Sequence, residues 1–310
     1  MNNRSAPIIG VVLALAVVAG ILALVLLNRE SSPPAASQSA SVIPSVAASL
    51  NQELLSQRLT VLVIGIDSSE QRRAEGYNTI NTDSMILASI SADQSQVVLI
   101  SLPRDAVDVP LPDGTTWTSK INGLEGAQGV DALVGAVSAL FGVSVDGYVQ
   151  VDMDGLLALV DAVGGVTVNP DQPLSDPKVY LDIGAGEQHL DGATALKYVR
   201  TRVDKDYGRD ARQQEVLLQL VTRLVSPETD VDLADLLNGL ASLETDLPLE
   251  DLPTLLELAR RAQDATVTTQ VLQPPDFISF EGDRGDGRGY ILEPDIEAIR
   301  AYAQEQIGTD

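Results

Sequence analysis

Six of the twenty Lys and Arg residues in this chain fall between Lys197 and Arg212, although its 310 residues carry a formal net charge of −24. Four of the six are arginines, whose planar donor groups match pairs of phosphate oxygens: Arg200, Arg202, Arg209 and Arg212. The cluster predicts a site for a phosphorylated ligand. A solvated helix face with internal ion pairs is the alternative that charge counting leaves open.

The spacing within the cluster indicates how its side chains could meet. In an extended stretch, Arg200 and Arg202 would project to one face, because side chains repeat every two residues. Arg209, Arg212 and Gln213 are spaced i, i+3 and i+4, which places them on one face of a helix. Two such arrays could converge on one diphosphate.

Two aspartates lie next to predicted strands. Asp67 follows an apolar run at 59–66, and Asp83 precedes a predicted strand at 85–90. If these strands pair, the two carboxylates come close enough to share a cation, and hard oxygen ligands of this kind favour Mg²⁺. Taken singly, each aspartate is more often a turn residue than a ligand.

Two further cations stand in loops. Arg104 follows Pro103 at the end of a predicted strand at 97–102, and Lys120 belongs to a polar loop that precedes a helix. A single cation at either place does not indicate a function. Both positions are therefore candidates only in combination with the cluster at 197–212.

Strands alternate with helices along the chain from residue 59 onward. Continuous apolar runs rich in β-branched residues predict strands, and apolar residues at helical intervals predict helices. We expect the strands at 59–66, 85–90 and 97–102 to be neighbours. Further strands are expected at 148–151, 166–168 and 266–272, and helices at 129–141, 153–163, 191–196, 209–224, 233–240 and 252–262 and after Pro294. The fold class is α/β, with a mixed central sheet and helices on both faces.

The N-terminal region indicates a membrane anchor. Residues 7–27 are apolar and uncharged, long enough at ~1.5 Å per residue to cross ~30 Å of hydrocarbon. A cleavable secretory signal is the competing interpretation, but its apolar core is usually shorter. We expect residues 1–6 in the cytoplasm, a transmembrane helix at 7–27, a Ser/Ala/Pro-rich extracytoplasmic linker at 28–58 and one domain at 59–310.

Composition excludes several function classes. The chain has no cysteine and a single histidine, His189, which leaves no disulfide, no thiolate ligand and little scope for a zinc site. So acidic a chain also lacks the broad basic surface that nucleic-acid binding needs. Carboxylates, guanidiniums and a hard metal remain for the chemistry.

A series of short motifs runs through residues 60–225. The motifs occur in the order Gly-Ile-Asp at 65–67, Thr-Asp-Ser-Met at 82–85, Leu-Pro-Arg-Asp at 102–105, Lys-Ile-Asn at 120–122, Val-Asp-Gly-Tyr-Val-Gln-Val-Asp at 145–152, Val-Gly-Gly-Val at 163–166, Leu-Asp-Gly-Ala-Thr-Ala-Leu-Lys-Tyr-Val-Arg-Thr-Arg at 190–202 and Asp-Tyr-Gly-Arg-Asp-Ala-Arg-Gln-Gln at 206–214. Together these motifs resemble the LytR-CpsA-Psr family, with 226–310 as an extension. The Tyr-Val-Arg-x-Arg…Gly-Arg-x-x-Arg-Gln-Gln block is the most specific of them.

This resemblance implies a membrane-anchored phosphotransferase outside the cell. Such an enzyme takes a glycopolymer from a polyprenyl-pyrophosphate lipid carrier and joins it to peptidoglycan through a phosphodiester. Asp67 and Asp83 match the family's magnesium-associated carboxylates, and the pyrophosphate-binding residues match Arg104, Arg200, Arg202, Arg209 and Gln213. We add Arg212 and Lys120 as further binding candidates. Asp206 or a metal-side carboxylate is the candidate proton acceptor.

Other functions and one departure from the family pattern stay open. A hydrolase of the lipid pyrophosphate and a non-catalytic lipid-pyrophosphate binder or envelope regulator would use the same residues. The family usually has Arg where this chain has Asn81, and Arg72 or Arg73 could reach in instead. Apolar residues of the helices within 129–163 and 209–225 are candidates to line a lipid channel. The Gly-rich charged loop at 276–293 receives no function.

Overall fold

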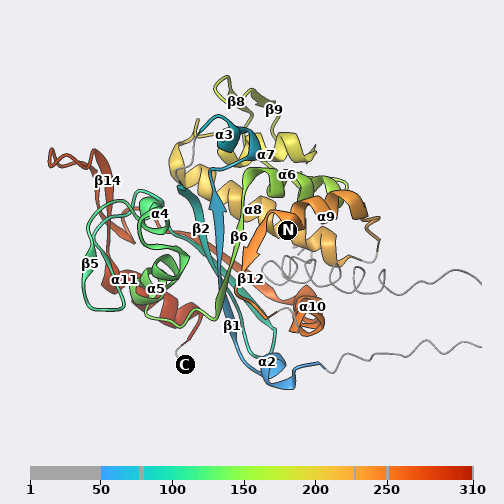
Figure 1. The fold of residues 1–310 in the computed structure, drawn as a ribbon, viewed down its shortest axis with the longest axis horizontal. Helices are drawn as coiled ribbons and strands as arrows, with labels where there is room; N and C mark the ends of the chain where they lie inside the picture. The colour runs from blue at the N-terminus through green and yellow to red at the C-terminus, as the bar shows by residue number, and fades with distance from the viewer. Residues whose placement is uncertain (1–49, 77–79, 227, 249–250, 309–310) are drawn as a thin grey trace, which may run out of the picture.

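A mixed six-stranded sheet forms the centre of the computed structural model, which describes residues 50–76, 80–226, 228–248 and 251–308 (Figure 1). In spatial order its strands are β11 (Leu243–Thr245), β6 (Gly147–Val151), β1 (Leu59–Ile66), β2 (Thr82–Ile90), β3 (Gln96–Ser101) and β12 (Thr266–Val271). β1 is parallel to β6 and β3 is parallel to β12, whereas the other neighbours are antiparallel.

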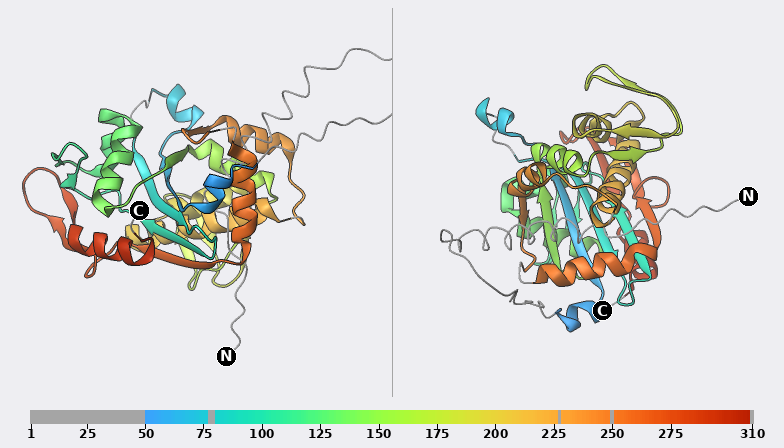
Figure 2. Two further views of the ribbon diagram at one scale, coloured as in Figure 1. Left: turned by 90° about the horizontal axis from the view of Figure 1, so that it is seen from below. Right: turned by 90° about the vertical axis from the view of Figure 1, so that its right-hand side faces the viewer.

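Helices cover both faces of this sheet (Figures 1 and 2). Alternation along β1 sends Val61 and Val63 into one core and Leu62 and Ile64 into the other. The first core is shared with α6 (Met153–Ala162), α7 (Gly192–Arg200), α8 (Lys205–Val225), α9 (Leu233–Ala241) and α10 (Leu252–Arg261). The second is shared with α4 (Leu124–Gln128), α5 (Val130–Phe141) and α11 (Ile296–Gln306). The predicted α/β class is confirmed.

Short elements complete the described part of the fold. Four antiparallel pairs lie outside the main sheet: β4 (Val109–Pro110) with β5 (Thr116–Trp117), β7 (Val166–Val168) with β10 (Gln188–Leu190), β8 (Leu174–Asp176) with β9 (Leu181–Ile183), and β13 (Ile278–Asp283) with β14 (Tyr290–Pro294). The short helices are α2 (Gln52–Ser56), α3 (Glu70–Ala74), η1 (Ile121–Gly123) and η3 (Ala262–Asp264).

Most predicted elements are present, and several differ in extent, type or pairing. β1, β2 and β3 are neighbours as expected, but β7 pairs with β10 outside the main sheet. α8 begins at Lys205, four residues before its predicted start. The 276–293 segment contains the β13–β14 hairpin. Residues 51–58, assigned to the linker, contribute α2 instead, and Leu55 is buried in the core.

The predicted cytoplasmic segment, transmembrane helix and most of the linker fall within residues 1–49, outside the described residues. Within the described part of the chain, no helix combines the length and apolar character needed to cross a bilayer.

Candidate active site

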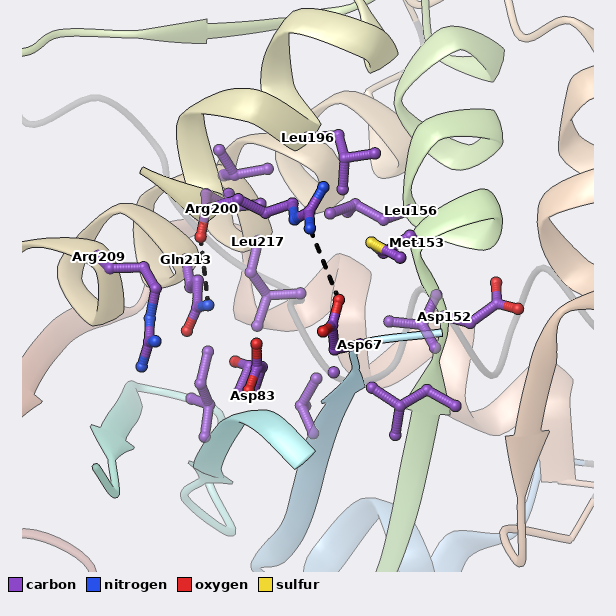
Figure 3. Close-up of a pocket in the computed structure, with 18 of the residues that line it drawn as sticks. Asp67, Asp83, Asp152, Met153, Leu156, Leu196, Arg200, Arg209, Gln213 and Leu217 are labelled. Atoms are coloured by element: carbon purple, nitrogen blue, oxygen red, sulfur yellow. Dashed lines mark hydrogen bonds and ion pairs between the residues drawn. The ribbon is translucent and has the colours of Figure 1, made fainter. Parts of the chain in front are cut away.

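A cavity of about 420 Å³ lies between the sheet and helices α6, α7 and α8 (Figure 3). Apolar side chains form much of its wall, among them Val63, Met153, Leu156, Leu196 and Leu217. Its polar part contains four arginines and three aspartates: Arg104, Arg200, Arg202, Arg209, Asp67, Asp83 and Asp152. The sequence cluster and the two separate aspartates therefore meet at one place.

Two of the aspartates stand where parallel strands end. Asp67 follows β1 and Asp152 follows β6, and carboxyl ends of adjacent parallel strands open into a common crevice. Asp152 is also the N-cap of α6, accepting from the Gly155 backbone N–H at 2.9 Å. Sequence reasoning assigned no role to Asp152, although its place between a strand and a helix was a usable signal.

Asp83 reaches the cavity through an irregularity in the β1–β2 pairing. The pairs on either side of it are Gly65 with Ser84 and Ile66 with Thr82, so Asp83 is the extra residue. Strict alternation would send it toward the far core with Met85 and Leu87. The extra residue reverses the alternation, and Asp83 lines the cavity on the same face as Ile86.

A glycine permits this close pairing. An added Cβ at Gly65 would stand 3.0 Å from the Cβ of Ser84, a separation tighter than ordinary side-chain contacts. The buried hydroxyl of Thr82 donates to Glu125 at 2.8 Å on the far side, which fixes the strand next to Asp83.

The four arginines come from different elements. Arg104 lies just beyond β3, Arg200 is the last residue of α7, Arg202 is in the following loop and Arg209 is on α8. The expected extended stretch through Arg200 and Arg202 is wrong, because α7 continues to Arg200. Both side chains line the cavity nonetheless, since the chain turns between the two helices.

Acidic and basic side chains alternate around the site. The ion-pair distances are 3.3 Å for Arg72–Asp67, 3.7 Å for Arg200–Asp67, 2.7 Å for Arg104–Asp83, 3.6 Å for Arg202–Asp83, 3.2 Å for Arg202–Asp206 and 2.9 Å for Arg209–Asp206. Arg72 thus reaches Asp67, as considered for the missing family arginine, while Arg73 pairs with Asp152 at 3.0 Å.

The guanidiniums of the site lie close enough to influence one another. Burial, together with the neighbouring charges of Arg104 and Arg209, lowers the pKa of Arg202. Burial acts in the same direction on Arg104, but the carboxylates of Asp83, Asp105 and Asp206 together outweigh it and raise the pKa of Arg104. A bound anion would relieve the crowding of positive charge around Arg202.

Arg209 is held by two carboxylates on its own helix. Its side chain is only 2% exposed, and its guanidinium donates to Asp210 at 2.7 Å while pairing with Asp206. Asp206 does not line the cavity and instead bridges Arg202 and Arg209. Asp210 was not among the residues predicted from the sequence. Its position directly after Arg209 in the motif at 206–214 was the signal that could have identified it.

We expect Asp210 to make stability depend on pH. Burial raises the pKa of Asp210 to about 6, with the charge of Arg209 only partly opposing the effect. The folded-state pKa of Asp210 lies above the ordinary value of 3.8, so folding favours the protonated carboxyl. Its contribution to the free energy of unfolding is fully present below pH 3.8 and is lost as the pH rises through about 6. The free energy of unfolding of wild type minus that of Asp210→Asn should fall by up to about 3 kcal/mol between pH 4 and 7 in urea denaturation. A difference that stays flat with pH would contradict this.

The remaining candidates divide into those inside and outside the cavity. Gln213 lines it, one helical turn beyond Arg209. Arg212 does not: its buried guanidinium donates to the backbone oxygens of Tyr198 and Thr201 and pairs with Asp204. Lys120 is also outside, paired with Asp105 at 2.9 Å.

The apolar wall differs in part from the expected channel lining. α6 and α8 contribute side chains as predicted, but α5, within the predicted 129–163 region, packs on the opposite face of the sheet. α7, Val179 and the strands β1, β2 and β6 supply the other apolar residues of the wall.

A metal would find only part of its ligand set here. Across the described ranges, no group of three or more His, Cys, Asp or Glu side chains is placed to hold an ion. Asp67 and Asp83 line one cavity beside the arginines. Mg²⁺ commonly binds one or two carboxylates together with substrate phosphates, so these two residues fit that mode.

A family model matches most of the sequence that forms this fold and site. The LytR_cpsA_psr family model matches residues 29–301. The chain belongs to the LytR-CpsA-Psr family. The resemblance inferred from the motifs is confirmed, and the motifs that carried it supply the arginines and aspartates of the cavity.

Several relatives within the LytR-CpsA-Psr family have names that describe their activity. The chain is 30% identical over 257 residues to the polyisoprenyl-teichoic acid–peptidoglycan teichoic acid transferase TagU of Oceanobacillus iheyensis, covering 79% of this chain and 74% of that protein. It is 29% identical to Biofilm regulatory protein A of Streptococcus mutans, covering 78% of this chain and 61% of that protein. It spans 50% of the Corynebacterium glutamicum cell wall biosynthesis protein LcpA.

Solved structures share the LytR-CpsA-Psr fold. The structure of B. subtilis TagV matches with a TM-score of 0.65 at 24% identity, covering 82% of this chain and 99% of that one. TagT bound to LIIa-WTA matches with a TM-score of 0.63 at 22% identity, covering 88% and 97%. These likenesses support the same α/β architecture.

Proposed function

We propose that the protein is a glycopolymer transferase, which moves a glycan from a polyprenyl-pyrophosphate carrier to peptidoglycan through a phosphodiester bond. One observation carries this proposal: four arginines and two aspartates from distant segments converge on one cavity whose remaining wall is largely apolar. A diphosphate fits the charged part, and a hydrocarbon chain fits the apolar part.

The names of relatives support the acceptor and the donor class. Two relatives called TagU are teichoic acid transferases acting between a polyisoprenyl-linked polymer and peptidoglycan. The cavity contains no feature that would distinguish teichoic acid from another glycan. We therefore propose the reaction class and leave the polymer general.

Two carboxylates of the cavity suit Mg²⁺ as a bound cofactor. Asp67 and Asp83 line it beside four arginines, and Mg²⁺ commonly binds one or two carboxylates together with substrate phosphates. A divalent cation at Asp67 and Asp83 would cancel their two negative charges and polarise the phosphate oxygens. In this arrangement the aspartates would hold the cation, and the arginines would bind the diphosphate.

The residues of the chain act mainly by positioning and charge stabilisation. An acceptor hydroxyl attacks the phosphorus next to the glycan, a new O–P bond forms, and the bond to the leaving polyprenyl phosphate breaks. Arg104, Arg200 and Arg202 offset the charge on the phosphoryl oxygens. The hydroxyl proton passes to a carboxylate of the site.

We also propose that the chain works at a membrane surface. Residues 7–27 form the apolar, uncharged run that would anchor it, with the described domain outside the cell. A lipid-linked donor would then lie in the same bilayer as the anchor of the protein. Its hydrocarbon chain would enter the cavity and pack against Leu156, Leu196 and Leu217.

A reconstitution tests the function directly. The full chain in detergent is incubated with a short-chain polyprenyl-pyrophosphate glycan, Mg²⁺ and a peptidoglycan acceptor, and the products are identified by mass spectrometry. We expect a glycan–peptidoglycan conjugate that contains one bridging phosphate. EDTA should slow its formation, and added Mg²⁺ should restore it.

The same assay separates the alternatives. Free glycan phosphate without conjugate would show a lipid-pyrophosphate hydrolase. Donor binding without either product would show a non-catalytic binder or regulator. Either outcome contradicts the transferase proposal.

A further inference from the structure

A second cleft, of about 360 Å³, is formed by residues to which the transfer step described above assigns no role. It is lined by Trp117, Ser119, Lys120, Asn122, Gly287 and Arg288. Two regions distant in sequence form it: the segment from β5 to η1, and the tip of the β13–β14 hairpin. Its volume lies in the usual range for small-molecule sites, roughly 300–1,000 Å³.

Ion pairs fix both walls of this cleft. Arg288 pairs with Asp108 at 3.0 Å and donates to the Thr118 backbone oxygen at 3.1 Å, which ties the hairpin to the loop before η1. Arg288 also pairs with Asp286, and Lys120 pairs with Asp105. Both cations already have carboxylate partners, so the cleft offers many hydrogen-bonding groups with little uncompensated charge.

Trp117 gives the cleft an apolar surface. Its indole Nε1 donates to the Lys120 backbone oxygen at 3.0 Å, and the ring packs partly against the second core. This fixes the ring in place while part of it stays exposed. The C–H face of a pyranose ring packs well on such an aromatic surface, while its hydroxyls need donors and acceptors around the edge.

A backbone hydrogen bond and an ion pair connect the cleft to the segment that carries Arg104. The side chain of Arg104 lines the cavity, and its backbone oxygen accepts from the backbone N–H of Asn122, which lines the cleft. Lys120 pairs with Asp105, the next residue along the chain from Arg104. The residues of the cleft are therefore held by the backbone on either side of the Arg104 side chain that is assigned to the phosphate.

We propose that this cleft binds an uncharged sugar residue of the acceptor glycan, with Trp117 as its stacking surface and Asn122 and Arg288 as hydrogen-bonding partners. This inference rests on the transferase function, because it supplies the place from which an acceptor hydroxyl approaches the donor. The ligand class is a neutral hexosamine-type sugar, since the paired cations leave no free charge for an acidic one.

The chain contains one tryptophan, which makes the test direct. The full chain in detergent is titrated with a β-1,4-linked tetramer of N-acetylglucosamine, without donor, while intrinsic tryptophan fluorescence is recorded. We expect a saturable change in emission. Maltotetraose, a neutral oligosaccharide of similar size, should produce a weaker response.

Two variants and one control locate the binding. Asn122→Ala removes a side chain from the cleft but keeps the backbone hydrogen bond, and Arg288→Ala removes the hairpin wall. Each should weaken sugar binding at least about tenfold. Arg284→Ala is the matched control, because Arg284 is on the same hairpin but packs over the ring of Phe280 and pairs with Glu293 outside the cleft.

The outcomes distinguish this proposal from the one on which it rests. No fluorescence response at millimolar tetramer would overturn the sugar cleft, and so would equal affinity in wild type and Asn122→Ala. Transfer activity in the reconstitution alongside either result would leave the transferase standing. A fluorescence response that both variants weaken, in a protein that makes no conjugate, would support the cleft and overturn the transferase.

Discussion

Replacement of Arg200 by alanine is expected to lower the rate of transfer about 10²- to 10³-fold while leaving the protein folded. The guanidinium lines the cavity and its closest carboxylate, Asp67, is 3.7 Å away, so it remains available to an incoming phosphate. Loss of one such donor to developing charge commonly costs about 3–4 kcal/mol of transition-state stabilisation. Its side chain is 43% exposed, so folding should depend on it little. Single-turnover rates and a melting curve measure the two effects.

Lys197 provides a matched control for this change. It is a cation on the same helix, α7, but does not line the cavity. Lys197→Ala should retain nearly full activity. Equal losses in the two variants would mean that general charge at this end of α7, and not the position of Arg200, matters for the reaction.

Replacement of Arg212 by alanine is expected to destabilise the fold by about 3–5 kcal/mol. Its buried guanidinium holds the last turn of α7 through the Tyr198 backbone oxygen at 2.9 Å, and it also contacts Thr201 and Asp204. Truncation leaves buried acceptors without a donor, which is among the costly kinds of substitution. Chemical denaturation of the variant measures the free energy of unfolding.

Arg212→Lys separates charge from geometry. Lysine keeps the positive charge, but its three N–H donors share one nitrogen and cannot reach three separated acceptors. It should therefore recover only part of the lost stability. Activity should fall in both variants, because the same contacts hold the loop that carries Arg202. If Arg212→Ala were as stable as wild type yet unable to bind donor, the original assignment of Arg212 to the diphosphate would be supported instead.

Five strands of the central sheet and most of the helices were predictable because their apolar patterns are local, whereas the short edge strand β11 was missed. β1 is a continuous apolar run rich in β-branched residues, and α5, α6 and α8 repeat apolar residues at helical intervals. The pairing of β1 with β2 followed from their order. The short pairs β4–β5 and β13–β14 were missed, since two to six residues with mixed polarity carry little periodic signal.

Which residues form the site could be predicted better than where their side chains lie. The motifs identified Asp83 and Arg202, but Asp83 reaches the cavity only because an extra residue reverses the alternation of β2. Periodicity also placed Arg212 beside Arg209, although its side chain turns to the end of α7. Such choices depend on which backbone groups need a partner, and a pattern of residue types does not contain that information.

The direction of β1 has a consequence for how the protein meets its substrate. Leu59 opens the strand at the end of the sheet far from the cavity, and eight residues at ~3.3 Å put roughly 25 Å between entry point and reaction centre. If residues 7–27 anchor the chain as proposed, the domain must tilt toward the bilayer before a lipid tail can enter the cavity. The length of the tether before residue 50 would then govern how often that encounter happens.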